Sequence, residues 1–154
     1  MISLMLMQGY CHWMISSCEM ADFTYLLDTN ILSNLIRDPV GRVAQRIAEK
    51  GENTVCTSIV VACELQFGAE KKQSGALRAR VEELLTVLDV LPLDVNADCY
   101  YAEIRATLEA VGTPLGPNDL LIAAHARTLD LILVSANVGE FSRVPGLTVE
   151  NWLE

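Results

Sequence analysis

Short apolar runs alternate with amphipathic segments along the chain from Asp22 onward. The apolar runs have the length and composition of buried strands, and the segments between them space their apolar residues as helices do. We therefore predict strands over residues 22–28, 54–58, 87–93, 131–137 and 147–152. Helices are predicted over residues 29–37, 40–50, 58–72, 74–86, 95–111 and 118–129.

Polar residues and glycines mark the ends of these segments. Thr29 or Asn30 can cap the first helix and Ser58 the third, because side-chain oxygens there accept hydrogen bonds from free backbone N–H groups. Gly51 and Gly112 are placed to end helices, since glycine tolerates the left-handed backbone found there. Strand and helix in repetition predict an α/β fold with a largely parallel sheet covered on both faces.

Length and composition indicate one globular domain. The chain has 154 residues, of which 51% are hydrophobic and 20% charged, which excludes disordered and collagen-like classes. Its net charge of −9 argues against a protein that coats DNA or binds anionic membranes through bulk electrostatics. Residues 37–80 hold eight basic and five acidic residues, a net +3. If the protein has a phosphate-binding rim, its basic residues come mainly from this stretch. The alternative is that these residues lie on ordinary solvated helix faces.

The first twenty residues differ from the rest. They hold all five methionines, and twelve of the first eighteen residues are apolar, without a basic flank. This composition makes a poor signal peptide and a poor membrane span. We expect residues 1–20 to be a disordered extension or the result of an upstream start, residues 21–154 to form the domain, and no membrane to be involved.

The five cysteines form no CxxC pair and no zinc-type spacing with histidine. An odd number of thiols without such a pattern favours a reducing, cytoplasmic compartment. Cys56 and Cys63 lie in apolar runs, where we expect them to act as small hydrophobic side chains.

Two polar residues end predicted strands. Asp28 ends the first strand and Asn137 ends the strand that begins at Leu131. Ligands of open parallel sheets bind beyond the carboxyl ends of the strands, so both residues are candidate site residues. The alternative for each is an ordinary turn or cap residue.

Two further carboxylates share a helix face with apolar residues. The helical neighbours of Glu64 are apolar, and Asp119 has apolar residues three, four and seven positions later. A buried carboxylate must be paired, hydrogen-bonded, protonated or bound to a metal. For Asp119, stabilisation by the helix terminus is the alternative. His125 falls on another helix face and is expected to be structural or exposed, and solvent is expected around Asp98, Glu103, Glu82, Glu83, Asp89 and Asp130.

Converging carboxylates repel one another unless a cation lies between them. Mg²⁺ prefers oxygen ligands and keeps several waters. Such an ion activates water for attack on a phosphodiester. Zn²⁺, a softer ion, is the alternative, but it prefers thiolate or imidazole ligands and the sequence has no cluster of them.

Short motifs follow one another in a fixed order between Tyr25 and Trp152. They are Leu27-Asp28-Thr29-Asn30, Cys63-Glu64-Leu65, Gly68-Ala69-Glu70, Ile104-Arg105, Gly112-Thr113-Pro114, Gly116-Pro117-Asn118-Asp119, Ile122-Ala123-Ala124-His125-Ala126, Ser135-Ala136-Asn137, Glu140-Phe141, Val144-Pro145-Gly146-Leu147 and Glu150-Asn151-Trp152. In order and spacing they resemble the PIN-domain ribonucleases, specifically the VapC toxins of bacterial toxin-antitoxin pairs. The resemblance implies a three-layer α/β/α sandwich around a central parallel sheet, in agreement with the pattern.

The resemblance also implies roles for individual residues. Asp28 and Asp119 match the principal metal-binding carboxylates of the family, and Glu64 matches the acidic residue that completes the cluster. Asn137 falls where many relatives carry a fourth acidic residue. Glu140, three residues later, either supplies that charge or is an ordinary solvated loop residue.

Thr29 and Ser135 match supporting positions, where a hydroxyl group can orient a carboxylate or a water. The implied activity is Mg²⁺- or Mn²⁺-dependent cleavage of RNA by metal-activated water, which leaves a 5'-phosphate and a 3'-hydroxyl. Enteric members attack the anticodon loop of initiator transfer RNA, which makes a single-stranded loop of that kind the candidate target. The implied partners are a VapB-type antitoxin, which can insert a basic side chain among the carboxylates, and a second copy of the chain in a homodimer.

Three alternatives remain open from the sequence. A phosphohydrolase of the haloacid-dehalogenase type also begins with a strand-end aspartate, but it carries a second Asp two positions later, where this chain has Asn30. A receiver-type domain would accept a phosphoryl group on Asp28. A catalytically silent PIN-like module would keep the fold for protein contacts alone.

Overall fold

Five parallel strands form the centre of the protein. The computed structural model describes residues 22–154, so the expectation for residues 1–20 lies outside the described part. The strands are β1 (Tyr25–Leu27), β2 (Val55–Ser58), β3 (Val90–Leu91), β4 (Ile132–Val134) and β5 (Val149–Glu150). They pair in the order β3-β2-β1-β4-β5, and every pair is parallel.

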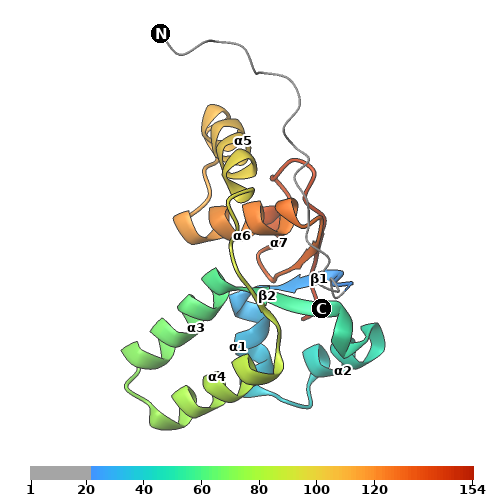
Figure 1. Cartoon of the computed structure of the whole chain (residues 1–154), viewed down its shortest axis with the longest axis vertical. Helices are drawn as coiled ribbons and strands as arrows, with labels where there is room; N and C mark the ends of the chain where they lie inside the picture. The colour runs from blue at the N-terminus through green and yellow to red at the C-terminus, as the bar shows by residue number, and fades with distance from the viewer. Residues whose placement is uncertain (1–21) are drawn as a thin grey trace.

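Helices cover both faces of this sheet. They are α1 (Thr29–Arg37), α2 (Arg42–Lys50), α3 (Ile59–Lys71), α4 (Gly75–Val87), α5 (Ala97–Ala110), α6 (Pro117–Thr128) and α7 (Val138–Phe141), with a 3-10 turn, η1 (Glu52–Thr54), before β2. Figure 1 shows α1 to α4 on one side of the strands and α5 to α7 on the other. The predicted three-layer α/β/α sandwich is therefore confirmed. No helix within residues 22–154 combines the length and the hydropathy of a membrane span.

The central strands are buried on both faces. Leu26 and Leu27 of β1 and Leu133 and Val134 of β4 are fully buried. Because helices lie on both sides, these strands are continuous apolar runs rather than alternating ones. The small residues of α6, including Ala123, are also fully buried and let this helix pack closely.

Local signals position the helix ends. Gly51 and Gly112 adopt positive φ values of 102° and 73° at the ends of α2 and α5, as predicted. The bounds predicted for the first helix, residues 29–37, are confirmed, but its predicted N-cap is wrong. Asp28, rather than Thr29 or Asn30, is its N-cap, because the Asp28 carboxylate accepts a hydrogen bond from the Thr29 backbone N–H.

The strand predicted over residues 87–93 is present but much shorter. Helix α4 continues to Val87, and only Val90–Leu91 pairs with β2. Leu88 packs against the core as the C-cap of α4, so the first residues of this apolar run belong to the end of the helix and not to the strand. The short helix α7 was not predicted, and the remaining strands are shorter than their apolar runs.

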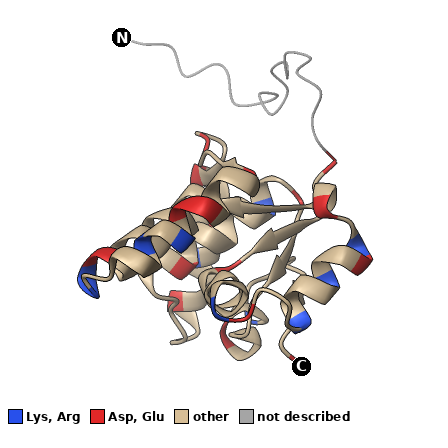
Figure 2. Ribbon diagram, turned by 90° about the horizontal axis from the view of Figure 1, so that it is seen from below, with Lys and Arg blue, Asp and Glu red and all other residues tan. Residues whose placement is uncertain are grey.

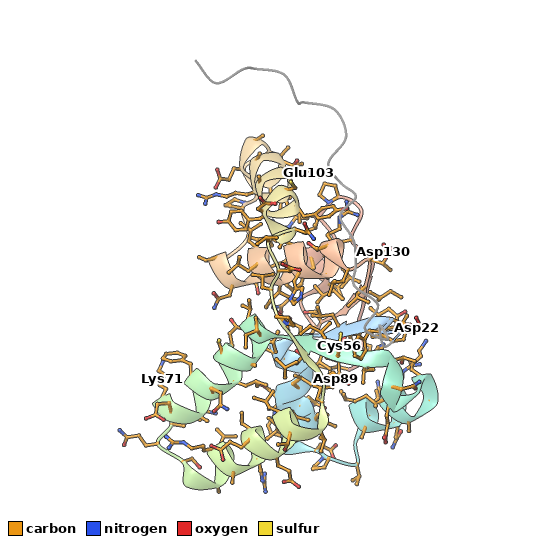
Figure 3. All side chains as sticks on the ribbon, in the orientation of Figure 1. Asp22, Cys56, Lys71, Asp89, Glu103 and Asp130 are labelled. Atoms are coloured by element: carbon orange, nitrogen blue, oxygen red, sulfur yellow. The ribbon has the colours of Figure 1, made fainter. Side chains whose placement is uncertain are left out.

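Several predictions about exposure are also settled. Cys56 is buried as expected, but Cys63 is exposed on α3, so its place in an apolar run was misleading. The six acidic residues expected in solvent are all exposed. Figure 3 labels three of them: Asp89 after α4, Glu103 on α5 and Asp130 before β4.

Ser58 connects three elements at the end of β2. Its hydroxyl oxygen accepts a hydrogen bond from the Val60 N–H and so caps α3. The same oxygen lies 2.8 Å from Nδ1 of His125, a fully buried residue of α6. Burial lowers the pKa of His125 and keeps its imidazole neutral. His125 is therefore structural, as expected, and it holds α6 against the start of α3.

We predict that Ser58→Ala destabilises the protein by about 2–3 kcal/mol, because it removes a helix cap and also leaves a buried imidazole nitrogen without its partner. Ser74→Ala is the matched control, since Ser74 caps α4 through the Leu77 N–H and its loss costs about 1 kcal/mol. Urea unfolding of the two variants measures the difference. Equal losses would show that the Ser58–His125 bond contributes nothing.

Candidate active site

Buried polar side chains gather at one edge of the sheet. Among the described residues, five polar or charged side chains are buried: Asp28, Thr57, Ser58, His125 and Ser135. Asp28 directly follows β1, Ser58 ends β2 and Ser135 directly follows β4. Thr57 is the next-to-last residue of β2, and His125 contacts Ser58. This edge is the carboxyl end of the sheet. The strand order also reverses direction beside β1, and ligands bind at such switch points in open α/β sheets.

Asp28 is the most buried carboxylate of this edge, with 2% of its surface exposed. Its Oδ2 accepts a hydrogen bond of 2.7 Å from the Ser135 hydroxyl, and its Oδ1 accepts one of 2.7 Å from the Thr29 N–H. Burial raises the pKa of Asp28, these hydrogen bonds lower it, and the charge of Glu64 raises it further, so that the pKa stays above its usual value. The Ser135 hydroxyl therefore orients the Asp28 carboxylate.

Asn30 is a site residue that the sequence analysis missed. Its Nδ2 donates to Asp28 Oδ2 at 3.1 Å and to Ser135 Oγ at 3.2 Å, and its Oδ1 accepts from the Ala136 N–H at 2.9 Å. It ties the start of α1 to the loop after β4 across 106 residues of sequence. Its place in the Leu27-Asp28-Thr29-Asn30 motif was the available signal, but that motif does not show which distant loop the amide contacts.

Glu64 faces the same edge from α3. Its carboxylate accepts hydrogen bonds from the Thr29 hydroxyl and from Asn118 Nδ2, the latter at 3.0 Å. Neighbours such as Leu65 are buried as predicted, but Glu64 itself is only half-buried. Thr29 and Asn118 thus orient the Glu64 carboxylate, and Asn118 is a second candidate residue that the sequence analysis missed.

Asp119 completes the group from the first turn of α6. Its pKa is raised to about 6, first by burial and then by the negative charges of Asp28, Glu140 and Glu64. Four carboxylates from four separate segments therefore act on one another. The ion pairs in residues 22–154 join Arg46 with Glu49, Arg78 with Glu70 and Arg105 with Glu109. None of them neutralises this group.

Asn137 and Glu140 flank the group on the solvent side, and both are exposed. The Asn137 backbone N–H donates to Ser135 Oγ at 3.0 Å, so Asn137 supports the hydroxyl that holds Asp28. Glu140 is on α7, and its charge contributes to the raised pKa of Asp119.

The donor set suits a hard divalent cation, but its members are not gathered into a ready-made site. Within the described residues, no three Asp, Glu, His or Cys side chains stand close enough to hold a metal ion. Glu64 is bound by Thr29 and Asn118 instead, and repulsion opposes a closer approach of the carboxylates. Carboxylate oxygens without a basic partner are the ligands that Mg²⁺ prefers, so an ion would draw them together.

A model of the PIN domain family matches residues 25–147 of the chain. The chain belongs to the PIN domain family. It is 40% identical over 129 residues to the tRNA(fMet)-specific endonuclease VapC of Shigella flexneri, covering 83% of this chain and 97% of that protein. It is 36% identical over 132 residues to Ribonuclease VapC2 of Rickettsia felis, with the same coverage. Within the family, the chain is therefore a PIN domain of the VapC type.

Solved structures show the same relationship. The structure of VapBC2 from Rickettsia felis, bound to a DNA fragment from its promoter, matches with a TM-score of 0.79 at 34% identity, over 84% of this chain and 99% of that one. VapBC-1 from nontypeable Haemophilus influenzae matches with a TM-score of 0.74 at 32% identity, over 86% of this chain and all of that one. The resemblance found in the sequence motifs is thus confirmed for family and fold.

The raised pKa of Asp119 predicts a pH-dependent stability. In the folded state the Asp119 carboxyl keeps its proton up to pH about 6, whereas in the unfolded state it loses the proton near pH 4. The free energy of unfolding therefore falls as the pH rises from about 4 to about 6. In the presence of chelator, Asp119→Asn should raise the free energy of unfolding by about 1 kcal/mol at pH 8, after discounting for solvent screening, and by nothing at pH 4.

Asp130→Asn is the control for this prediction, because Asp130 is exposed and asparagine tolerates its positive φ. Denaturant unfolding at several pH values measures both variants. A gain for Asp119→Asn that is the same at every pH would contradict the raised pKa of Asp119 as its cause.

Proposed function

We propose that this protein is a metal-dependent endoribonuclease and the toxin of a type II toxin-antitoxin pair. The observation that carries the proposal is the group of carboxylates Asp28, Glu64, Asp119 and Glu140 at the carboxyl edge of a VapC-type PIN domain, which has no ion pair with a basic side chain of residues 22–154. Relatives at 36% and 40% identity are named as a ribonuclease and a tRNA-specific endonuclease. The nuclease function is therefore favoured over the phosphohydrolase and receiver alternatives.

Asp28, Glu64 and Asp119 would hold Mg²⁺ or Mn²⁺ through their oxygens. When bound, the ion supplies water of lowered pKa and neutralises charge that develops on the phosphate. The chain supplies the positioning. Ser135 and Asn30 hold the Asp28 carboxylate in one orientation. Burial, followed by the negative charges of Asp28, Glu140 and Glu64, raises the pKa of Asp119 and so favours its binding of a cation or a proton.

The substrate we propose is single-stranded RNA, with the anticodon loop of initiator transfer RNA as the first candidate. The name of the Shigella flexneri relative supports this target, and a loop presents unpaired bases that a nuclease site can reach. The ribose 2'-OH need not take part, because water is the nucleophile and the products carry a 5'-phosphate and a 3'-hydroxyl.

The partner we propose is a VapB-type antitoxin, since the matching structures are VapBC complexes. A basic side chain of that protein would neutralise the carboxylates in place of the cation. A homodimer and a cytoplasmic location remain expectations of the family resemblance and of the cysteine pattern.

The decisive experiment is cleavage of RNA by the full chain after removal of any antitoxin. We expect cleavage with Mg²⁺ or Mn²⁺, none with chelator, and a loss of at least a hundredfold in kcat for Asp28→Asn, on the order of the losses seen when a charge-stabilising group is removed. Glu103→Gln is the matched control, because Glu103 is exposed on α5. Mapping the 5' ends of cellular RNA after brief expression tests activity and target together.

Two of the alternatives have their own outcome in this design. Intact RNA with both metals, together with unchanged toxicity and partner binding for Asp119→Asn, would favour the catalytically silent module. Covalent labelling of Asp28 by a phosphodonor would favour the receiver-type alternative.

Cation binding is a separate prediction. Millimolar Mg²⁺ should raise the melting temperature of the wild-type chain, because binding to the folded state adds about 2.7 kcal/mol at a hundredfold excess over Kd. Asp28→Asn should reduce this shift, and Asp130→Asn should keep it. Differential scanning calorimetry with Mg²⁺ and with chelator gives the comparison, and no shift for the wild type would contradict a magnesium site.

A further inference from the structure

A groove leads away from the carboxylates between α1, α3 and α4. It has a volume of about 470 Å³. Thr29, Asn30 and Glu64 line one part of it, so it is continuous with the candidate active site. Figure 1 shows that α3 and α4 form a hairpin beside α1, on the face of the sheet opposite α6. A ligand chain in the active site can therefore extend along this groove.

The groove has two basic lining residues, Arg37 and Lys72. Arg37 follows Thr29 by eight residues along α1, and Lys72 follows Glu64 by eight residues at the end of α3. At about 1.5 Å of rise per helical residue, each basic residue lies roughly 12 Å from the carboxylate end. Two helices thus repeat the same arrangement, with a site residue at one end of the groove and a basic residue at the other.

Both basic side chains are available for a ligand. Neither takes part in the ion pairs of the described chain, and both residues are exposed. Arg37 uses only its Nε, in a 3.3 Å hydrogen bond to the Ser33 carbonyl. Its two terminal nitrogens keep the forked geometry that suits a phosphate.

The surrounding charge makes this position distinctive. Outside residues 37–80 the chain has three basic and fifteen acidic residues. Figure 2 shows the Lys and Arg residues as separate short segments, without one broad basic face. RNA is repelled by most of this acidic surface. Arg37 and Lys72, which take part in no ion pair of the described chain, are therefore a specific binding site for its phosphates in the groove.

The floor between the two ends is apolar. It is formed by Ile36, Leu65, Ala69, Leu77 and Val81. An apolar floor offers contact to the faces of unpaired bases, which a duplex keeps stacked inside. The combination of basic end and apolar floor therefore matches single-stranded RNA.

We propose that this groove binds the single-stranded RNA that flanks the scissile phosphate, with Arg37 and Lys72 as a clamp on its phosphates. The inference rests on the proposed nuclease function and adds the path of the substrate. The clamp positions the strand and takes no part in the chemistry. It supplies binding energy at a distance from the reacting bond, so its loss raises KM more than it lowers kcat.

The test compares two double variants of the full chain. Arg37→Gln with Lys72→Gln removes the clamp, and Lys71→Gln with Arg80→Gln removes the same charge from exposed positions outside the groove. Lys71 lies near the tip of the α3–α4 hairpin (Figure 3). We expect the clamp variant to raise KM by roughly tenfold or more at low salt, the worth of one or two charge-assisted contacts, with kcat nearly unchanged. The control variant should change KM far less.

Salt dependence provides a readout that a purely structural role would not change. Binding of a labelled single-stranded RNA is measured in an Asp28→Asn background, which prevents cleavage. Two lost phosphate contacts should reduce the slope of log K against log salt by about 1.4. A neutral methylphosphonate linkage beside the mapped cleavage bond should weaken binding with the clamp intact and have no effect once the clamp is removed.

The outcomes separate the inference from the function on which it rests. If the wild type cleaves RNA while the clamp variant keeps its KM and salt slope, or loses no more than the control variant, the inference is wrong and the nuclease function stands. Equal affinity for double-stranded RNA also overturns it. If the clamp variant keeps RNA affinity and loses only affinity for a VapB-type antitoxin, the groove docks a protein instead. If the wild type neither cleaves nor binds RNA, both proposals fail.

Discussion

The burial of one carboxylate at the end of the central strand is the constraint on which the rest of the site depends. Asp28 is almost inaccessible to solvent, and an unpartnered buried carboxylate would be costly. The cost is offset by a serine hydroxyl from the loop after β4 and by a backbone N–H and an asparagine amide from the start of α1. Because Leu27 pairs with Val134 in the sheet, the register of β1 and β4 itself places Asp28 beside Ser135.

The neighbouring carboxylates repel Asp28 and one another, which opposes this arrangement. Asp119 has its pKa raised to about 6 by burial and by three like charges, which costs stability at neutral pH. Glu64 is held by two neutral donors rather than by a cation. Folding alone would not favour such a group, and sites of this kind are where function takes precedence over stability. A divalent cation or a basic side chain of a partner would relieve the same repulsion.

The distribution of charge over the whole chain also determines where a polyanion can bind. The protein is strongly acidic overall, at −9, while its proposed substrate is a polyanion. Attraction must therefore be local, and the groove between α1, α3 and α4 brings two basic residues into line with the acidic end. A cation at one end and a basic clamp at the other would hold successive parts of one strand, so that binding and chemistry are divided along the groove.

Several features could be predicted from the sequence, because each depends on neighbours within one or two helical turns. They are the order of strands and helices, the glycine helix ends, the solvated acidic residues and the candidates Asp28, Glu64 and Asp119. The extent of β3 could not be predicted, since only packing decides how much of the apolar run after α4 pairs with β2. Exposure of Cys63 was misjudged for the same reason. The roles of Asn30 and Asn118 were decided by the tertiary structure alone. Their partners, Ser135 and Glu64, lie 105 and 54 residues away, and a hydrogen bond between such positions leaves no periodic trace in either segment.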